Sequence, residues 1–171
     1  MIGLGLCPFA DPVFRAGTLR YALYPGTDPS EFLEFLSVEL RSLAAASRDA
    51  TETTLVIAPG IYPDFLDFND FMGVVENLVE DLTLSGVIQA VGFHPRFLFA
   101  ESAPDAAENF TNRSPHPMIH LLREESISDV SGDPEALAEV PRRNTRTLQR
   151  LGTAQLEKLL HSASHPPSSE K

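Results

Sequence analysis

The first half of the chain alternates between short β-type patterns and longer helical ones. Residues 20–24 (RYALY) alternate in character and carry aromatic rings, which indicates a β-strand. Residues 53–58 (TTLVIA) are β-branched or apolar throughout, which is typical of a strand buried on both faces. Residues 87–93 (VIQAVGF) predict a third strand. A Pro-Gly pair follows each of the first two patterns and marks a turn there.

Two amphipathic helices are predicted between these strands. Asp28 suits the N-cap, Pro29 the first helical position and Glu31 the capping box, so the first helix begins here. Its apolar face is predicted from four residues at helical spacing: Phe32, Leu36, Leu40 and Leu43. The second helix is predicted from a similar set: Phe68, Phe71, Val75, Leu78, Val79 and Leu82.

The order β-α-β-α-β, with helices long enough to be crossovers, predicts an α/β fold with a small, mainly parallel sheet. Beyond His94 the pattern becomes irregular. Short helices are expected over 105–110 and 117–125, and a longer one over 144–160. We therefore expect one α/β domain over residues 1–160 with an irregular, helical C-terminal third.

The net charge of the chain narrows the classes of molecule that it is expected to bind. The 171 residues include 24 acidic and 13 basic side chains, a net charge of -11, and most of the acids lie in the first half. Such a surface repels nucleic acid and anionic membranes. No apolar run approaches the roughly 20 residues that span a bilayer. We therefore expect no nucleic-acid or membrane partner, because the main basic cluster is too short for a nucleic-acid footprint: Arg142, Arg143, Arg146 and Arg150.

The single cysteine and the C-terminal composition add two expectations. One cysteine, Cys7, excludes an intramolecular disulfide and a zinc site built from several thiolates. Without a secretory leader pattern, this predicts a cytoplasmic protein. Residues 161–171 (HSASHPPSSEK) are polar and proline-rich, which predicts a disordered tail.

Candidate catalytic and ligand-binding side chains are concentrated in residues 92–125. This segment contains three of the five histidines and three arginines. In a parallel sheet, ligands gather beyond the carboxyl ends of the strands, and His94 follows the third strand directly. This placement favours an acid/base or ligand role for His94. The alternative is a histidine that ends the strand by bonding a nearby carbonyl.

His116 and His120 are the other candidate metal ligands. If Pro117 starts a helix, these imidazoles lie one turn apart and can share a metal, with His94 as a third ligand. No Glu follows His116, so the zinc-protease motif is absent. His120 alone as a catalytic or polar site residue is the simpler interpretation.

Arg113 and Arg123 are candidate anion ligands, with Asn109 and Asn112 as further substrate-binding candidates. A guanidinium held in a loop presents a planar fork to carboxylate or phosphate. The alternative is that both arginines brace the loop by pairing with internal acids: Asp105, Glu108 or Glu124.

Cys7 lies in the sequence GLCPFA and precedes an expected helix start. A thiol in that position is a candidate nucleophile that His94 or His120 can activate. Ala10 stands where a second redox cysteine would be, which rules out a dithiol mechanism. The alternative is a small, buried apolar side chain.

Five segments together resemble the bacterial and plant protein family known as domain of unknown function 1415: GLGLCPFA at 3–10, TTLVIAP at 53–59, DFLDFNDF at 64–71, GFHPRFLFA at 92–100 and AENFTNRSPHPMIHLLRE at 107–124. The resemblance implies a shared fold and pocket but no reaction. It draws attention to seven residues: Cys7, His94, Asn109, Asn112, Arg113, His120 and Arg123. It also implies a missing N-terminal helix, and an aromatic residue is usual at position 116, which counts against His116 as a required ligand.

Three functional hypotheses follow. The first is a cytosolic enzyme acting on a small anionic metabolite, with the arginines as a clamp, His94 or His120 moving a proton, and Cys7 as a possible nucleophile. The second is a metal- or haem-binding protein that uses His94 and His120. The third is a non-catalytic interaction module in which the arginines are internal braces.

Overall fold

The centre of the fold is a mixed β-sheet. The computed structural model describes residues 2–130 and 134–164. Within these residues the sheet has the strand order β1-β2-β4-β3. β1 pairs parallel with β2, whereas β4 lies antiparallel to both of its neighbours, β2 and β3. Since β2 and β3 both oppose β4, the strands β1, β2 and β3 point the same way, and their carboxyl ends share one edge. The strands are β1 (Leu19–Leu23), β2 (Thr53–Ile57), β3 (Ile88–Phe93) and β4 (Met118–Arg123).

The α/β class is confirmed, but the prediction of a mainly parallel sheet is wrong. Two of the three strand pairings are antiparallel, because the residues predicted as a helix over 117–125 form β4 and the start of α4 (Glu124–Val130). Ile119 and Leu121 are fully buried on one face of the sheet, and His120 points to the other. Apolar residues occur on both faces of β4, so its sequence lacks the regular alternation of apolar and polar residues that predicts a strand.

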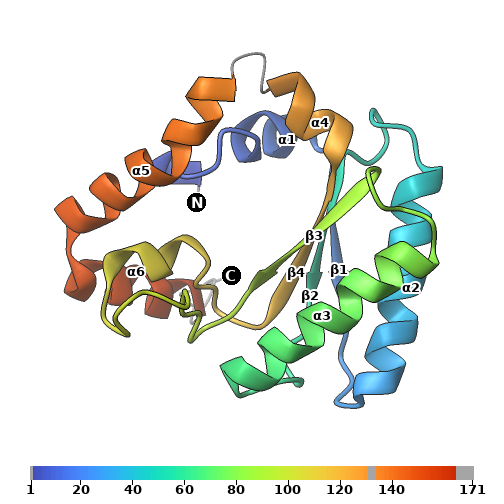
Figure 1. Ribbon diagram of the computed structural model, residues 1–171, viewed down its shortest axis with the longest axis horizontal. Helices are drawn as coiled ribbons and strands as arrows, with labels where there is room; N and C mark the ends of the chain where they lie inside the picture. The colour runs from blue at the N-terminus through green and yellow to red at the C-terminus, as the bar shows by residue number, and fades with distance from the viewer. Residues whose placement is uncertain (1, 131–133, 165–171) are drawn as a thin grey trace, which may run out of the picture.

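Helices α2 (Pro29–Ala45) and α3 (Phe65–Asp81) cover one face of the sheet (Figure 1). The predicted N-cap is confirmed, since the Asp28 carboxylate accepts hydrogen bonds from the amides of Ser30 and Glu31 at 2.8 and 3.0 Å. The predicted apolar face of α2 is also confirmed and buried: Phe32, Leu36, Leu40 and Leu43. From α3 the buried residues are Phe68, Phe71, Val75 and Val79.

Close packing of α3 on β3 fixes where β3 ends. A Cβ on Gly92 would lie 2.9 Å from a ring carbon of Phe68, so only glycine allows this approach. Large side chains of this core, such as Phe32 and Phe68 at 1% exposure, each contribute about 1.5–3 kcal/mol by burial. The core therefore holds the start of the loop after β3 in place.

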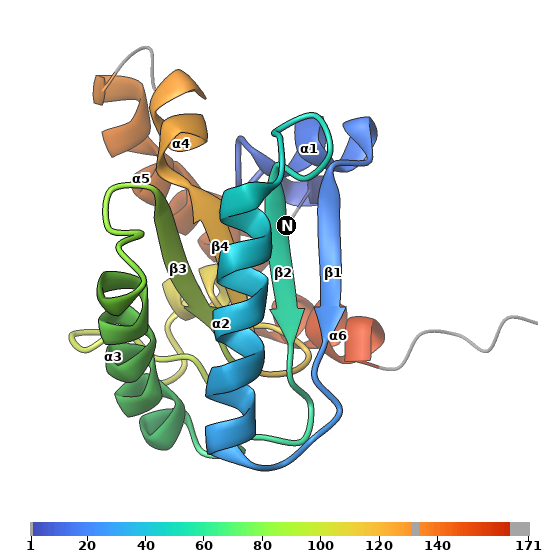
Figure 2. The same cartoon turned by 90° about the vertical axis from the view of Figure 1, so that its right-hand side faces the viewer.

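The remaining described elements lie mostly on the other side of the sheet (Figures 1 and 2). They are the 3₁₀ helices η1 (Ile2–Leu4) and η2 (Ala107–Thr111), and the helices α1 (Ala10–Ala16), α5 (Pro134–Leu151) and α6 (Thr153–Ser164). A second, smaller core joins them: Leu6, Phe110, Leu148 and Leu156. This layer includes the N-terminal segment, although nearly 140 residues separate Leu6 from its α5 partner Asn144.

Three predicted boundaries in the C-terminal third differ from the structure. The helix expected over 105–110 is the 3₁₀ helix η2, and the helix expected over 144–160 is divided at Gly152, whose φ of 74° suits glycine. The predicted tail starts too early, because α6 continues to Ser164, and residues 165–171 lie outside the described residues. No helix in the described ranges is long and apolar enough to cross a bilayer.

Candidate functional site

His94 is buried directly after β3, at the carboxyl edge predicted for it, with 1% of its surface exposed. Its Nε2–H donates to the carbonyl of Tyr62 at 3.0 Å, and its Nδ1 accepts the amide N–H of Arg96 at 3.0 Å. Burial lowers the pKa of His94, so the neutral imidazole is favoured. Because both ring nitrogens have protein partners, neither is left for a proton or a metal in this conformation.

The contact with Tyr62 gives His94 a clear structural effect. Tyr62 has a φ of 50°, a left-handed conformation that a non-glycine residue rarely adopts. His94 bonds the carbonyl of that residue and packs against the rings of Phe65 and Phe68, with centroids 5.6 and 5.3 Å away. The histidine therefore holds the loop after β2 against the loop after β3, which agrees with the carbonyl-bonding alternative.

Asn109 and Asn112 bond main-chain groups in the segment after β3. Asn109 is fully buried; its Oδ1 accepts the amide of Phe99 at 3.0 Å and its Nδ2 donates to the carbonyl of Ala103 at 2.8 Å. Asn112 donates from Nδ2 to the carbonyl of Gly92 at 3.1 Å, and its own carbonyl accepts the amide of His94. An irregular buried segment needs such partners because no helix or strand satisfies its backbone.

Arg113 braces the same segment. It donates from Nε to the carbonyl of Phe97 at 3.3 Å and from one terminal nitrogen to the carbonyl of Pro104 at 2.7 Å. Its guanidinium carbon lies 4.4 Å from the centre of the Phe110 ring, a cation–π contact. Burial lowers the pKa of Arg113, but an arginine remains charged at neutral pH.

Arg123 lies at the end of the sheet opposite to the end that carries His94. It pairs with Ile88 at the start of β3, whereas Phe93 at the end of β3 pairs with Met118. Its guanidinium donates to three carbonyls in and after the last turn of α2, at 2.7, 2.7 and 3.1 Å: Leu43, Ala46 and Thr51. The structure therefore does not bring Arg113 and Arg123 together, and the clamp predicted from them is not formed. Both are braces, through carbonyls rather than the acids we expected.

Cys7 and His116 are each separate from the other candidates. Cys7 is half-buried between η1 and α1, and no hydrogen bond joins it to His94 or His120 in the described residues. His116 is exposed and lies in a bend before a strand rather than at the start of a helix, so the helical spacing that would bring it next to His120 is absent. Among residues 2–130 and 134–164, no group of three or more His, Cys, Asp or Glu is placed to hold a metal ion.

His120 occupies the middle of the sheet face that α2 and α3 do not cover. We call this the second sheet face and define it by residues that alternate with the core: Leu19, Tyr21, Leu23, Thr53, Leu55, Ile57, Gln89, Val91, Phe93, Met118, His120 and Leu122. The pairing aligns Tyr21, Leu55, His120 and Val91 in one row across the four strands. His120 is thus an imidazole among apolar neighbours.

Thr53 determines which nitrogen of His120 carries the proton. The Thr53 hydroxyl donates to the carbonyl of Leu121 at 2.5 Å, so its oxygen accepts from Nε2–H of His120 at 2.8 Å. Burial lowers the pKa of His120 to about 4, which makes the ring neutral near pH 7. Nδ1 is then a hydrogen-bond acceptor, and in the described part of the chain no residue bonds it.

Thr53 is a site residue that the sequence analysis missed. A hydroxyl at the start of a buried apolar strand needs a hydrogen-bond partner, and this requirement was the available signal. The partner, His120, is 67 residues away in the sequence. Only the antiparallel pairing of β2 with β4 makes the two neighbours.

Comparison with known proteins assigns the chain to a family. A family model described as "Protein of unknown function (DUF1415)" matches residues 1–158. Comparisons with curated proteins and with solved structures give no match. The chain belongs to the DUF1415 family.

Proposed function

We propose that this member of the DUF1415 family binds a small, mostly apolar molecule against the second sheet face, where Nδ1 of His120 accepts a hydrogen bond or a proton from it. The observation that carries the proposal is the neutral imidazole of His120, which has one nitrogen fixed by Thr53 and the other without a partner among the described residues. A ring held in one tautomer by a neighbouring group is the arrangement by which proteins prepare a histidine for ligands or acid–base chemistry.

The surroundings of His120 indicate the chemical class of the ligand. Leu55 and Val91 lie opposite it on the neighbouring strands, and the cause of its lowered pKa is burial rather than a charged group. A charged ligand would lose its hydration here without gaining an ion pair. The guanidinium groups once expected to hold an anion bond main-chain carbonyls instead. We therefore infer a ligand with an apolar body and one O–H or N–H donor.

The row of residues that leads to His120 supplies a route of approach. Tyr21 and Leu23 on the edge strand β1 are 56% and 60% exposed, although both are apolar or aromatic. Tyr21 pairs with Leu55, which pairs with His120, so an apolar strip runs from the open edge to the imidazole. Exposed apolar surface of this kind favours contact with an apolar ligand.

Acid–base catalysis by His120 is part of the same proposal. With a pKa of about 4, the free imidazole is a good acceptor of hydrogen bonds but a weak base. A ligand that develops negative charge beside Nδ1 would raise this pKa and let the ring take the proton. Arg113, Arg123, Asn109 and Asn112 would support the fold in this proposal and would not touch the ligand.

The test compares phenol with anisole, which have similar apolar bodies but differ in the O–H donor. Side-chain ¹⁵N and backbone NMR titrations of the whole chain would report binding at His120. We expect phenol to bind about fivefold more tightly than anisole, the effect of one hydrogen bond. His120→Gln, which retains an amide near the position of Nε2 but no acceptor at Nδ1, should abolish this difference.

His116→Gln is the matched control, because His116 is exposed and outside the sheet. It should leave the preference for phenol unchanged. Equal affinities for the two probes in the natural chain, or a preference that persists in His120→Gln, would contradict the proposal.

A further inference from the structure

Helix α5 carries an arginine face on an otherwise acidic protein. Arg142, Arg143, Arg146 and Arg150 are four of the 13 basic residues, and all four are exposed. Like charges three or four residues apart on a helix repel one another, so such a cluster is unfavourable unless counter-charges approach it. We define the arginine face by these four residues.

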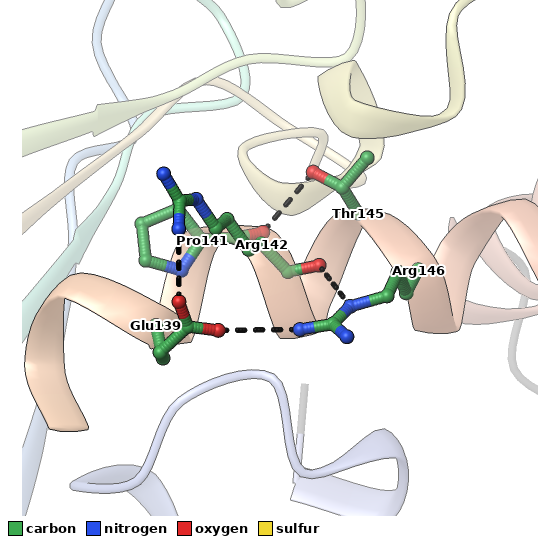
Figure 3. A pocket seen from close by; sticks show the side chains of 5 residues that line it. All are labelled: Glu139, Pro141, Arg142, Thr145 and Arg146. Carbon is green, nitrogen blue, oxygen red and sulfur yellow. Dashed lines mark hydrogen bonds and ion pairs between the residues drawn. The ribbon is translucent and has the colours of Figure 1, made fainter.

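The arginine face has two hollows with different electrostatics. The first is lined by Glu139, Pro141, Arg142, Thr145 and Arg146 (Figure 3). Glu139 lies between two guanidinium groups there and bonds Arg142 at 3.0 Å and Arg146 at 3.2 Å. Two positive charges share one internal carboxylate, so one of the two charges is compensated in this hollow.

The second hollow shares Arg146 with the first, and within the described residues only this arginine of the second hollow pairs with a carboxylate, that of Glu139. It has a volume of about 680 Å³ and is lined by Arg143, Arg146, Gln149 and Arg150. Arg143 donates to the carbonyl of Gly5 at 3.0 Å, and Arg150 donates to the carbonyl of Arg146 and the hydroxyl of Thr147, both at 3.4 Å. These acceptors are neutral, and within the described residues neither Arg143 nor Arg150 pairs with a carboxylate.

The opposite face of α5 is anchored, so the arginine face is held on a rigid support. Asn144 donates to the carbonyl of Leu6 at 2.7 Å and is 6% exposed, and Leu148 is 1% exposed in the second core. Arg143 is fixed at one end by its bond to the N-terminal segment. A site on a fixed element loses less side-chain freedom when a ligand binds.

We propose that the second hollow binds a compact anion that carries two or more phosphate or carboxylate groups. The guanidinium groups of Arg143 and Arg150 and the Gln149 amide supply donors whose geometry matches the oxygens of these groups. Arg146, which also bonds Glu139, adds a third guanidinium beside them. A long polyanion is disfavoured, because the net charge of the chain is -11 and the acidic helices α2 and α3 lie across the sheet from α5. This site is distinct from His120 and does not depend on the function proposed above.

Isothermal titration calorimetry on the whole chain at low ionic strength tests this site with two probes, inorganic tripolyphosphate and citrate. We expect saturable binding of at least one of them, and the tighter probe identifies the anion class. Arg143→Gln combined with Arg150→Gln should weaken that binding about tenfold or more, the effect of lost charge-assisted hydrogen bonds. Arg41→Gln, which removes an exposed charge on α2, should change it less than about twofold.

The single variant Arg150→Gln controls for a folding defect, since the bonds of Arg150 to described residues all lie within its own helix. It should retain the circular dichroism spectrum of the natural chain and still weaken binding. Absence of saturable binding for both probes, or an equal loss in Arg41→Gln, would overturn the proposal. Tighter binding of a single-stranded oligonucleotide than of either probe would also overturn it and would make nucleic acid the partner.

Discussion

His94 and His120 are both neutral imidazoles held by burial, yet they differ in how many ring nitrogens the protein uses. In His94 both nitrogens are bonded, to the carbonyl of Tyr62 and the amide of Arg96. In His120, within the part of the chain that the structure describes, only Nε2 is bonded, to Thr53. The comparison teaches that two histidines with similarly lowered pKa values can differ in how many ring nitrogens the protein satisfies, and only the second property leaves a nitrogen open to a ligand.

The largest expected effect is the loss of His94. His94→Ala removes a buried ring between Phe65 and Phe68 together with two hydrogen bonds, and leaves the left-handed Tyr62 without its partner. We expect the free energy of unfolding to fall by about 4 kcal/mol, measured by urea denaturation. His116→Ala, at an exposed position, should change it by less than about 0.5 kcal/mol. A small effect of His94→Ala would remove the distinction between the two histidines.

The next largest effect is a pH dependence of the free energy of unfolding, which we attribute to His120. Its pKa is about 4 in the folded protein against 6.5 as the ordinary value, so the unfolded chain binds the proton more readily. The stabilisation is complete above about pH 6.5 and is lost as the pH falls toward about 4. The difference in unfolding free energy between the natural chain and His120→Gln should therefore shrink by about 3 kcal/mol over this window. A difference independent of pH would mean that His120 is not held neutral.

Arg123 tests whether a guanidinium singled out by the sequence is a brace. Arg123→Met removes three hydrogen bonds to carbonyls near the end of α2, which no other described side chain satisfies. We expect a loss of about 2 kcal/mol in urea denaturation. Arg41→Met, on the exposed side of α2, is the matched control and should be nearly neutral. Equal effects of the two changes would contradict the bracing role.

The smallest effect is expected at Thr53. Thr53→Val keeps the shape of the side chain but removes the hydroxyl that accepts from His120 and donates to Leu121. Stability should fall by about 1 kcal/mol. The clearer measurement is ¹⁵N NMR of the His120 ring, which should change from one tautomer to a mixture. Retention of a single tautomer would show that another group orients the ring.

The elements with local causes could be predicted from the sequence. The N-cap at Asp28 and the spacing of Phe32, Leu36 and Leu40 are properties of one helix, and the structure confirms them. Residues 53–58 likewise revealed β2 through an uninterrupted run of β-branched and apolar side chains. In each case the signal and the structure it specifies lie within a few residues of each other.

The site depended on pairings between distant segments, which the sequence did not reveal. Arg123 bonds carbonyls 72 to 80 residues away, and His120 bonds a hydroxyl 67 residues away. The apolar character of both faces of β4 made Met118–Arg123 look helical after Pro117. The concentration of polar side chains after β3 is visible in the sequence and suggests a catalytic or binding site. Much of it satisfies the backbone of an irregular segment.

The place of β4 in the sheet has a consequence for how the protein is made. β2 and β3 emerge from the ribosome before β4 (Met118–Arg123). They do not pair with each other, because β4 lies between them in the sheet. Until β4 is made, the nascent chain exposes two unpaired strand edges, which favour misassociation. The sheet therefore cannot close until residues 118–123 have been made, and fragments that end before residue 118 should aggregate where the 171-residue chain does not.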